Sequence, residues 1–531
     1  MRFPKELEDY NTLIEISNAD KQNMSNLCEI MTDALIYYLH NWDTAHGKEA
    51  LTSAEELYVQ ISKLFHVNYK MNIWAVPDWY PSDFTVTTFL AMYLLIPDTS
   101  SKGDVAKLLL DLIKQPNRVF TNFIPVSDSL MLVGPWLLAH EQLGTLDKAL
   151  KHSSYQLVLK YLDFDISTRQ GSAGLHRDLS HIQDTRCLNY TNLWRMCRNN
   201  YAYTFLLTED LRKRSPTPLW NRITRTIYHE RIPITLWSLS TKTNKQATEV
   251  YPGTKWGLHV MPFGRILRYF TKDVNFMVRG QQTKLPIYMA TNDDSVPIEY
   301  WTQSRQVFHR EADPEAEIKY PCVGLIVYNN LDLNRLRGYS ERYRGDTVYS
   351  NDAFSWVFQY MNYGVLTQSG HDEANLLLKI HELIFIDESR KNLTIYMQFF
   401  DDRKIEGDLK YYPTTDYSKA VRIESSKLML VKTTYNFHTK KYASETMPPE
   451  TLDVNKEISK LTNDKLTIQM LKDNRGAIVY HEGKPIIYAP SLLENETEEV
   501  TITSDSYVAG EFPTVTFKFN KELNQYCSEF A

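Results

Sequence analysis

The periods of hydrophobic and polar positions divide the chain into a helical first part and a β-type second part. In the first 230 residues apolar side chains recur at steps of three and four, which is typical of amphipathic helices. After a change between about residues 223 and 257, short alternating segments bounded by Gly and Asn turns indicate antiparallel strands. The expected helices span 26–42, 53–65, 82–95, 102–114, 127–143, 146–162 and 191–207.

The β-type part contains ten segments that we expect to form strands. They span 234–239, 274–278, 322–328, 393–400, 427–432, 466–470, 477–480, 486–488, 500–503 and 514–519. A polar, proline-bearing stretch at 445–462 indicates a linker between two β units. With 531 residues, the chain is too long for one hydrophobic core. We expect an α+β multidomain protein: a helical domain over 1–230, a central antiparallel β domain over 250–445 and a small β domain over 460–531.

Composition and charge narrow the classes of ligand. The net charge of −6 gives no general attraction to nucleic acid, and no apolar run approaches the roughly 20 residues of a membrane span. The N-terminal residues contain no apolar signal core, so a soluble chain is expected. Between Arg169 and Arg231, however, eleven Arg or Lys face five Asp or Glu. This local excess indicates either a polyanionic ligand or solvated helix faces.

A polar loop at 174–194 is the first candidate for chemistry. It carries His181 and Tyr190, a base and a phenol that can together remove and deliver a proton. His176 and His181 lie five residues apart and would not share one helix face, so a metal pair is not expected. The five scattered cysteines argue against a zinc site and a disulfide scaffold. No metal or cofactor is predicted.

The same loop carries Asp178 and Asp184, for which two interpretations stay open. They could form the carboxylate pair of a glycoside hydrolase. They could also neutralise the neighbouring Arg177 and Arg186, which is the more common case.

Three further clusters of candidate residues lie just before, or at the start of, expected helices or strands. Trp74, Trp79 and Tyr80 stand before a helix and could stack on sugars or plug a bundle. Asn122 and Asp128 lie around another helix start, where Ser127-Asp-Ser129 are ordinary capping residues. In the segment 261–269, Gly264 allows close backbone approach, while Arg265 and Arg268 could grip a carboxylate or serve only solubility.

These clusters and the helix-then-sheet order resemble polysaccharide lyase family 8, and within it the envelope lyases of baculovirus occlusion-derived virions. The resemblance spans most of the chain. It implies an incomplete helical barrel, the α/α toroid, followed by antiparallel β-sandwich domains. It also implies β-elimination at the uronate of an acidic polysaccharide such as chondroitin or hyaluronan, without a metal or cofactor. The implied location is a virion envelope or the secreted fraction, with other envelope proteins as partners.

The resemblance also assigns roles residue by residue. It makes His181, Tyr190, Arg265 and Arg268 catalytic. It makes a second set substrate-binding: Trp74, Trp79, Tyr80, Asn122, Asp128, Asp184 and Arg186.

Two departures from the family pattern keep an alternative open. Where the family has an asparagine that neutralises the uronate, this chain has Asp128 between two serines. A strict alignment of the polar loop places Asp184 at the family's histidine, whereas a shift of three residues places His181 there. The chain is therefore either a lyase or a catalytically degenerate relative that serves as a virion structural or polysaccharide-binding protein.

Overall fold

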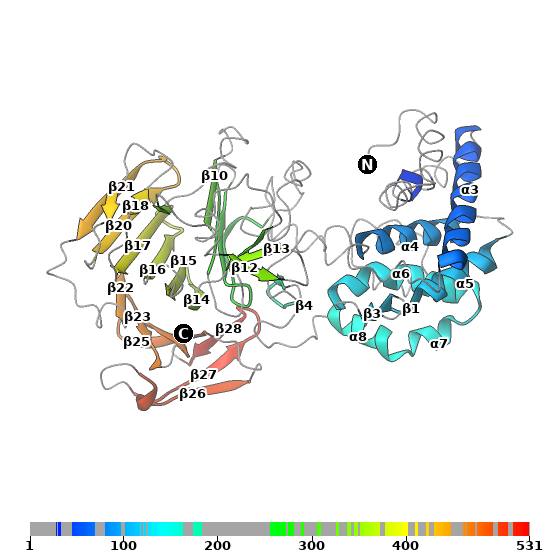
Figure 1. Cartoon of the computed structure of the whole chain (residues 1–531). Coiled ribbons are helices and arrows are strands. Elements are labelled where there is room, and N and C mark those ends of the chain that lie inside the picture. Colours follow the sequence, from blue (N-terminus) through cyan, green and yellow to red (C-terminus); the bar gives the residue numbers. More distant parts are fainter. Residues whose placement is uncertain are drawn as a thin grey trace. The chain divides into compact units, whose positions relative to one another are not determined.

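The computed structural model divides the chain into two compact units (Figure 1). Unit 1 contains residues Met1–Ile166 and Thr191–Asn221, and unit 2 contains Ser167–Tyr190 and Arg222–Ala531. The structure describes residues 28, 30–32, 35, 45–68, 80–96, 101–116, 118–119, 122–123, 126–162, 174–182, 255–271, 274–280, 288–290, 305–309, 325–328, 337–340, 345–348, 351–371, 378–401, 409–412, 421–423, 429–447, 460–463, 465–472, 475–491, 497–507 and 513–529.

Unit 1 is helical, as the apolar periodicity predicts. In α5 the buried side chains are Val105, Ala106, Leu108, Leu109 and Leu112, which follow three- and four-residue steps. Residues 28, 30–32 and 35 are helical as well, within the helix expected at 26–42. The helices are α3 (Ala45–Asn68), α4 (Tyr80–Leu94), α5 (Lys102–Leu112), α6 (Val126–Gln142), α7 (Leu146–Leu150) and α8 (Ser153–Leu162).

Two expected helices end or break where local chemistry opposes them. The helix expected to reach residue 114 stops at Leu112, and β1 (Ile113–Gln115) pairs with β2 (Arg118–Val119). Pro116 explains this stop, because a residue before proline is disfavoured in the helical region. The helix expected at 146–162 breaks between α7 and α8, where the ring Nδ1 of His152 accepts the backbone N–H of Ser154 at 3.2 Å.

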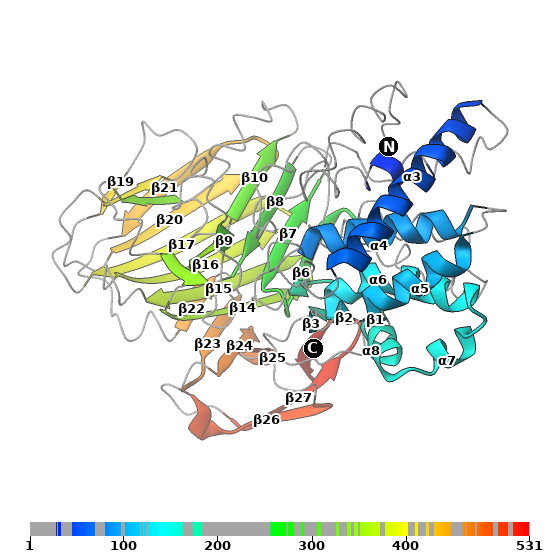
Figure 2. The ribbon, with the colours of Figure 1, turned by 45° about the vertical axis from the view of Figure 1, so that its right-hand side comes forward.

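Unit 2 is built from antiparallel sheets, which Figure 2 shows from a second direction. A four-stranded sheet has the order β10-β8-β7-β6, a six-stranded sheet β14-β15-β16-β17-β20-β21, and a seven-stranded sheet β22-β23-β24-β25-β28-β27-β26. The strands of the first sheet are β6 (Gly257–Met261), β7 (Ile266–Phe270), β8 (Val274–Arg279) and β10 (Arg305–His309). Those of the second are β14 (Asn351–Tyr360), β15 (Tyr363–His371), β16 (Leu378–Asp387), β17 (Asn392–Asp401), β20 (Met429–Asn436) and β21 (Tyr442–Met447).

The seven-stranded sheet occupies the C-terminal part of the chain. Its strands are β22 (Lys460–Asn463), β23 (Leu466–Met470), β24 (Gly476–His481), β25 (Lys484–Pro490), β26 (Glu499–Ile502), β27 (Val515–Asn520) and β28 (Gln525–Ser528). Smaller sheets contain β3 (Asn122–Phe123), β4 (Gly174–Leu175), β5 (His181–Ile182), β9 (Tyr288–Ala290), β11 (Leu325–Tyr328), β12 (Arg337–Ser340), β13 (Gly345–Val348), β18 (Leu409–Tyr412) and β19 (Val421–Ile423).

The six-stranded sheet has a hydrophobic core on each of its faces. On one face Val357, Leu366 and Ile384 pack with Leu267 and Phe276 of the four-stranded sheet. On the other face a second core joins it to the seven-stranded sheet; its members include Trp356, Phe358, Val365, Ile468, Val479 and Ile487. Burying both faces of this sheet stabilises unit 2, because each buried apolar side chain contributes about 1.5–3 kcal/mol.

Several expectations for the β part need adjustment. The hairpin of β14 and β15 and the neighbouring strand β16 were not among the expected strands, although they belong to the six-stranded sheet of unit 2. The linker expected at 445–462 begins later and ends earlier, since β21 runs to Met447 and β22 starts at Lys460. The helix expected at 191–207 and the strand expected at 234–239 lie outside the described residues. The α/α toroid, expected as an incomplete helical barrel, and the three domain boundaries stay predictions.

Candidate functional site

The polar loop begins as a tight hairpin. β4 and β5 pair Leu175 with His181, and between them the N–H of His176 donates to the carbonyl of Ser180 at 2.8 Å. The turn is closed by a bond of 2.9 Å from the N–H of Leu179 to the carbonyl of His176. Leu179 has φ +71°, a left-handed conformation that costs a branched residue about 1–3 kcal/mol. The hairpin therefore holds His181 next to a strained turn.

The carboxylate of Asp178 joins this hairpin to the turn between β6 and β7. Its Oδ1 accepts the backbone N–H of Ser180 at 3.0 Å and the hydroxyl of Ser180 at 2.6 Å. Its Oδ2 accepts the backbone N–H of Phe263 at 2.6 Å and that of Gly264 at 3.3 Å. Asp178 is 6% exposed, so both oxygens are satisfied by the protein rather than by water. We call these four hydrogen bonds the Asp178 clamp.

Ring stacking and a close backbone approach complete the contact. The ring of His176 stacks on that of Phe263, with centroids 5.2 Å apart and planes 14° apart. A Cβ added to Gly264 would lie 2.5 Å from the Cβ of Ser180. Only glycine allows this approach. The loop with His181 and the turn with Arg265 thus meet, although 86 residues separate Asp178 from Gly264.

Arg265 ends that turn and reaches the C-terminal sheet. It has φ +56°, and its carbonyl accepts the N–H of Gly280 at 2.6 Å. Its guanidinium Nη2 donates to the carbonyl of Pro490 at 2.8 Å and also to that of Ser491. The residue is 1% exposed, and burial lowers the pKa of its guanidinium to about 9 against the opposing effects of Asp178 and Tyr488. The side chain therefore stays charged at neutral pH and fixes the end of β25.

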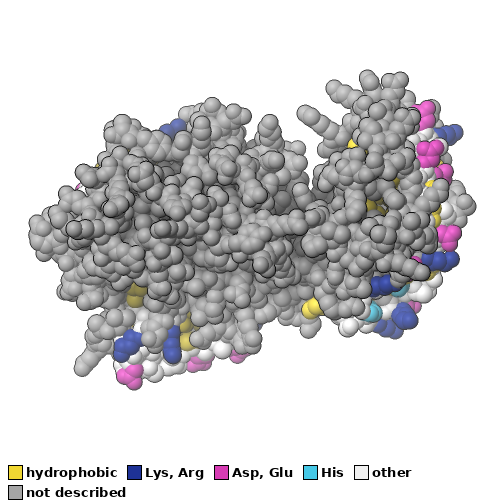
Figure 3. All heavy atoms as spheres, in the orientation of Figure 1, with side chains coloured by type: hydrophobic (Ala, Val, Ile, Leu, Met, Phe, Trp, Pro, Cys, Tyr) yellow, Lys and Arg dark blue, Asp and Glu magenta, His cyan; other side chains and the backbone are white. Residues whose placement is uncertain are grey.

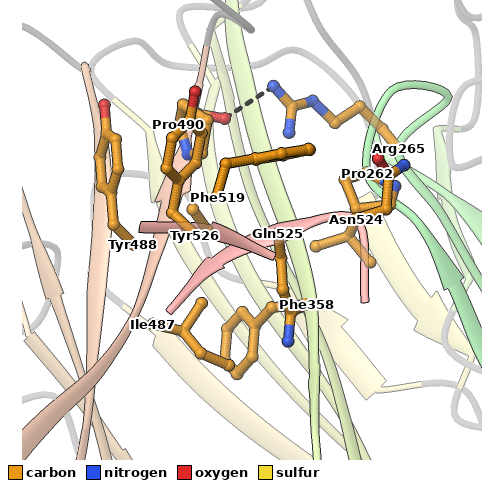
Figure 4. A pocket seen from close by; sticks show the side chains of 12 residues that line it. Pro262, Arg265, Phe358, Ile487, Tyr488, Pro490, Phe519, Asn524, Gln525 and Tyr526 are labelled. Carbon is orange, nitrogen blue, oxygen red and sulfur yellow. Dashed lines mark hydrogen bonds between the residues drawn. The ribbon is translucent and has the colours of Figure 1, made fainter. Parts of the chain in front are cut away.

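A small pocket lies beside this contact (Figure 4). Pro262 and Arg265 line it together with side chains of β14, β25, β27 and β28, and Figure 4 marks the bond from Arg265 to Pro490. The space holds about one water molecule, so it is too small for a sugar ring. A polysaccharide would have to bind elsewhere.

Arg268 has a different environment. It lies in β7 and has no exposed surface. Its Nη1 donates to the carbonyl of Lys255 at 2.8 Å, and its guanidinium carbon lies 4.3 Å from the centroid of the Phe270 ring. The catalytic roles predicted for Arg265 and Arg268 require contact with a substrate, and in this structure neither side chain offers more than 1% of its surface. Those roles stay predictions.

For the remaining predicted site residues, the structure describes either the backbone alone or nothing. His181 opens β5, Tyr80 opens α4, Asn122 opens β3, and Asp128 lies in the first turn of α6. The side chains of these four are not described. Five others lie outside the described residues, namely Trp74, Trp79, Asp184, Arg186 and Tyr190. The structure therefore brings together the loop of His181 and the turn of Arg265, and their predicted partners stay untested.

Asp178 is the residue whose function sequence reasoning did not anticipate. It was interpreted as a hydrolytic carboxylate or as a counter-charge to Arg177, whereas it accepts four hydrogen bonds inside unit 2. The local half of the clamp has a sequence signal, because an Asp two residues before a Ser forms a common side-chain turn. The bonds to Phe263 and Gly264 have no such signal.

The described surface suggests neither a metal centre nor a membrane span. Among the described residues, no three His, Cys, Asp or Glu side chains are grouped to hold a metal ion. No helix in that part of the chain is long and apolar enough to cross a membrane. On unit 1, acidic and basic side chains are interspersed where Figure 3 colours them. The described residues of this unit include an exposed ion pair of Lys107 with Asp104 at 3.2 Å.

Comparison with solved structures shows a lyase-like fold. The chain is similar to ODV-E66, described as a novel chondroitin lyase and baculovirus envelope protein, with a TM-score of 0.52 and 12% identity over 94% of this chain and 84% of that one. Chondroitinase AC lyase gives a TM-score of 0.45 and 10% identity over 99% of this chain and 95% of that one. Heparan sulfate lyase HepC from Pedobacter heparinus gives 0.40 and 10% over 90% and 84%.

Comparisons of sequence give no match. No protein-family model matches the chain, and no curated protein matches it. The structural likeness to ODV-E66 therefore shows the fold alone. Virion proteins as partners find no support in these comparisons.

Proposed function

We propose that this chain is a glycosaminoglycan lyase of viral envelope type that cleaves an acidic polysaccharide, such as chondroitin or hyaluronan, by β-elimination. The fold shared with ODV-E66 supports the class of protein. The Asp178 clamp carries the proposal, because it joins the two segments on which the proposed catalytic residues lie. We further propose that the helices of unit 1 form an α/α toroid and that the sheets of unit 2 are the β-sandwich domains of such lyases.

The proposed reaction moves one proton and breaks one C–O bond. His181 removes the proton from C5 of the uronate, and the electrons of that C–H bond form the C4=C5 double bond. The bond from C4 to the glycosidic oxygen breaks, and Tyr190 delivers a proton to the departing oxygen. Acid–base residues contribute about 10²–10⁴-fold each to such a step. The product is an unsaturated uronate, with no water added.

Backbone strain next to the Asp178 clamp supports a functional role for the clamp. Leu179 and Arg265 both hold left-handed conformations, at φ +71° and φ +56°, and they flank the contact of Ser180 with Gly264. Strained residues of this kind persist where surrounding contacts hold them, and they cluster at functional sites. We propose that the clamp fixes the position of the His181 hairpin before substrate binds.

In the proposed site, Arg265 acts mainly by holding the backbone around it in place. Its guanidinium is engaged by the carbonyls of Pro490 and Ser491, so it sets the turn that receives the Asp178 carboxylate. Neutralisation of the uronate is assigned to residues outside this contact: Asn122 and Arg186. Stacking on the sugar rings is assigned to Trp74, Trp79 and Tyr80.

The activity test is the appearance of a conjugated uronate, which absorbs ultraviolet light. The full chain is incubated separately with chondroitin, hyaluronan and heparan sulfate, and with a neutral polysaccharide as the blank. We expect absorbance to rise with at least one acidic substrate and not with the neutral one. His181→Ala and Tyr190→Phe should each lower the rate by about 10²-fold or more.

A histidine elsewhere in unit 2 provides the matched control. His438 is exposed in the turn after β20, so His438→Ala should leave the rate unchanged. If the folded wild-type chain releases no unsaturated product from any glycosaminoglycan, the lyase proposal is wrong. Binding of these polysaccharides without turnover would identify the chain as a non-catalytic relative.

A further inference from the structure

Two hairpin loops of the six-stranded sheet have the same construction. One joins β16 to β17 and the other joins β20 to β21, and these four strands are consecutive in the order of the sheet. In each loop a short polar side chain at the end of the first strand accepts a backbone N–H three residues later. Oδ1 of Asp387 accepts the N–H of Arg390 at 3.1 Å, and Oδ1 of Asn436 accepts that of Thr439 at 2.7 Å.

The next residue of each loop is a lysine in the left-handed backbone conformation. Lys391 has φ +55° and Lys440 has φ +56°. A third loop of this construction joins β27 to β28: Oδ1 of Asn520 accepts the N–H of Leu523 at 3.0 Å, and Asn524 follows with φ +55°. Glycine and asparagine are the usual residues in this conformation. The two neighbouring loops therefore keep lysine at a position that favours glycine or asparagine.

The two loops with lysine are fixed against each other. The N–H of Phe437 donates to the carbonyl of Lys391 at 2.9 Å. Nδ2 of Asn436 donates to Oδ1 of Asn392 at 2.7 Å and to the carbonyl of Arg390 at 3.4 Å. Because these bonds involve the backbone or the strand ends of both hairpins, the loops lie side by side in set positions.

The side chains that these loops expose include four cations. Arg390, Lys391, Lys440 and Lys441 are exposed, and we call these four residues the basic rim. Asp387 is 5% exposed, and its Oδ2 lies 3.5 Å from Nε of Arg390. Among the described residues, no carboxylate lies within ion-pair distance of Lys391 or Lys441. The rim is thus a surface of positive charge.

The basic rim lies away from the Asp178 clamp. Glu388, in the first of the two loops, has its Oε1 at 3.3 Å from the N–H of Leu258, at the start of β6, and accepts a hydrogen bond from it. The clamp contacts Phe263, beyond the other end of β6. At about 3.4 Å per residue, the strand separates the two places by about 14 Å. The rim is therefore distinct from the hairpin that carries His181.

Cations held close together on rigid loops fit a soluble polymer that carries many negative charges. Ammonium groups bind sulfate and carboxylate oxygens as point charges, and a guanidinium binds them through its planar donors. Since the loop backbones are already fixed, binding requires less ordering of the protein. Within the described residues, neither loop exposes a large apolar side chain of the kind that inserts into a membrane surface. The rim therefore favours a polyanion over a membrane.

We propose that the basic rim is a binding site for a segment of an acidic polysaccharide, separate from the proposed catalytic hairpin. The side chains of Arg390, Lys391, Lys440 and Lys441 bind its sulfate or carboxylate groups. Such a site keeps a long polymer attached to the chain between cleavage events. The choice of a polysaccharide rests on the proposed function, whereas the binding of a polyanion rests on the rim itself.

Acetylation of lysine side chains by N-hydroxysuccinimidyl acetate, followed by peptide mass spectrometry, locates the contact on the full chain. Chondroitin sulfate and heparan sulfate are the probes, and neutral dextran is the blank. We expect at least one probe to reduce acetylation of Lys391, Lys440 and Lys441. Acetylation of Lys472, an exposed lysine after β23, should not change. Equal acetylation of the rim lysines with and without both probes overturns the proposal.

Double variants measure the contribution of the lysines. Lys391→Asn with Lys440→Asn gives both loops the residue that the third loop has at Asn524, so the unfolding midpoint should stay unchanged or rise. The affinity for the polysaccharide, measured by calorimetry, should fall by about tenfold or more. Lys391→Arg with Lys440→Arg should retain it. Lys472→Asn with Arg475→Asn removes two exposed charges elsewhere in unit 2 and should bind like the wild type.

The outcomes separate this site from the lyase proposal. If Lys391→Asn with Lys440→Asn binds both polysaccharides like the wild type, the rim proposal is overturned, even where the chain releases unsaturated product. Weakened binding in that variant, with no unsaturated product from the wild type, supports the rim and contradicts only the lyase proposal. Binding to phosphatidylserine vesicles through the same lysines, without binding to either polysaccharide, assigns the rim to a membrane and overturns the proposal.

Discussion

The backbone N–H of Phe263 donates a hydrogen bond of 2.6 Å to the carboxylate of Asp178, across 85 residues of sequence. The carboxylate of Asp178 is buried, and its hydrogen-bond donors come from two segments: Ser180 on one side and the turn at 263–264 on the other. Because this hydrogen bond joins residues far apart in the sequence, it fixes the position of the hairpin that carries His181 against the rest of unit 2.

Asp178→Asn should destabilise unit 2 by about 2 kcal/mol, because an amide presents one acceptor oxygen and turns its NH2 group toward buried N–H donors. Denaturation in urea measures the change. Asp505→Asn alters an exposed carboxylate of the same unit and should change the free energy of unfolding by less than about 0.5 kcal/mol. Equal midpoints for the two variants would show that the clamp contributes no stability.

Gly264→Ala should cost about 1–3 kcal/mol, because the new Cβ would meet the Cβ of Ser180 at 2.5 Å. Removing that opposing atom with Ser180→Gly should make the double variant more stable than additivity predicts. Gly103→Ala is the control, since nothing lies within 4 Å of its added Cβ and it should be neutral or stabilising. Thermal unfolding of the four variants gives the comparison, and strict additivity would refute the contact.

The sequence was sufficient for the helical character of unit 1 and for the antiparallel strand character of most of unit 2. Periodicity identified α4 and α6 within about two residues, because a repeated apolar face depends only on local spacing. It missed β14 and β15, in which polar residues such as Gln359 and Gln368 interrupt the apolar alternation. Both faces of this sheet are buried, so the simple in–out pattern of a half-exposed strand does not apply.

The candidate site was predictable only in part. The residue types of the polar loop and the Gly-Arg turn identified both segments of the contact. The sequence could not show that Asp178 joins them, since that bond depends on the folded path of unit 2. Nor could the sequence show that the guanidinium of Arg265 donates hydrogen bonds to the carbonyls of Pro490 and Ser491, which lie 225 and 226 residues away.

Arg265→Met should destabilise the chain by about 2–4 kcal/mol, because two backbone carbonyls at the end of β25 lose their charged donor. Guanidinium denaturation, followed by tyrosine fluorescence, measures the effect. The control is Arg475→Met, which alters an exposed arginine next to β24. A loss of lyase activity in Arg265→Met at full stability would instead indicate direct catalysis by this arginine.

Acid should weaken unit 2 through His381. Burial lowers the pKa of this imidazole to about 4, while the unfolded chain takes up the proton near 6.5. The contribution to stability is therefore complete above pH 6.5 and is lost as the pH falls toward 4, by about 3 kcal/mol. His381→Leu should reduce the fall in unfolding free energy between pH 7 and pH 4.5. His438→Gln, at an exposed position, should show the wild-type pH dependence.

Mass spectrometry of polysaccharide fragments distinguishes β-elimination by this chain from hydrolysis and from mere binding. Hyaluronan or chondroitin is digested with the wild-type chain and with His181→Ala, and the new ends are weighed. We expect wild-type fragments that lack the mass of one water relative to hydrolysis products, and no such fragments from His181→Ala. Fragments that carry the added water, or an undigested polymer in the presence of folded wild-type protein, would contradict the lyase proposal.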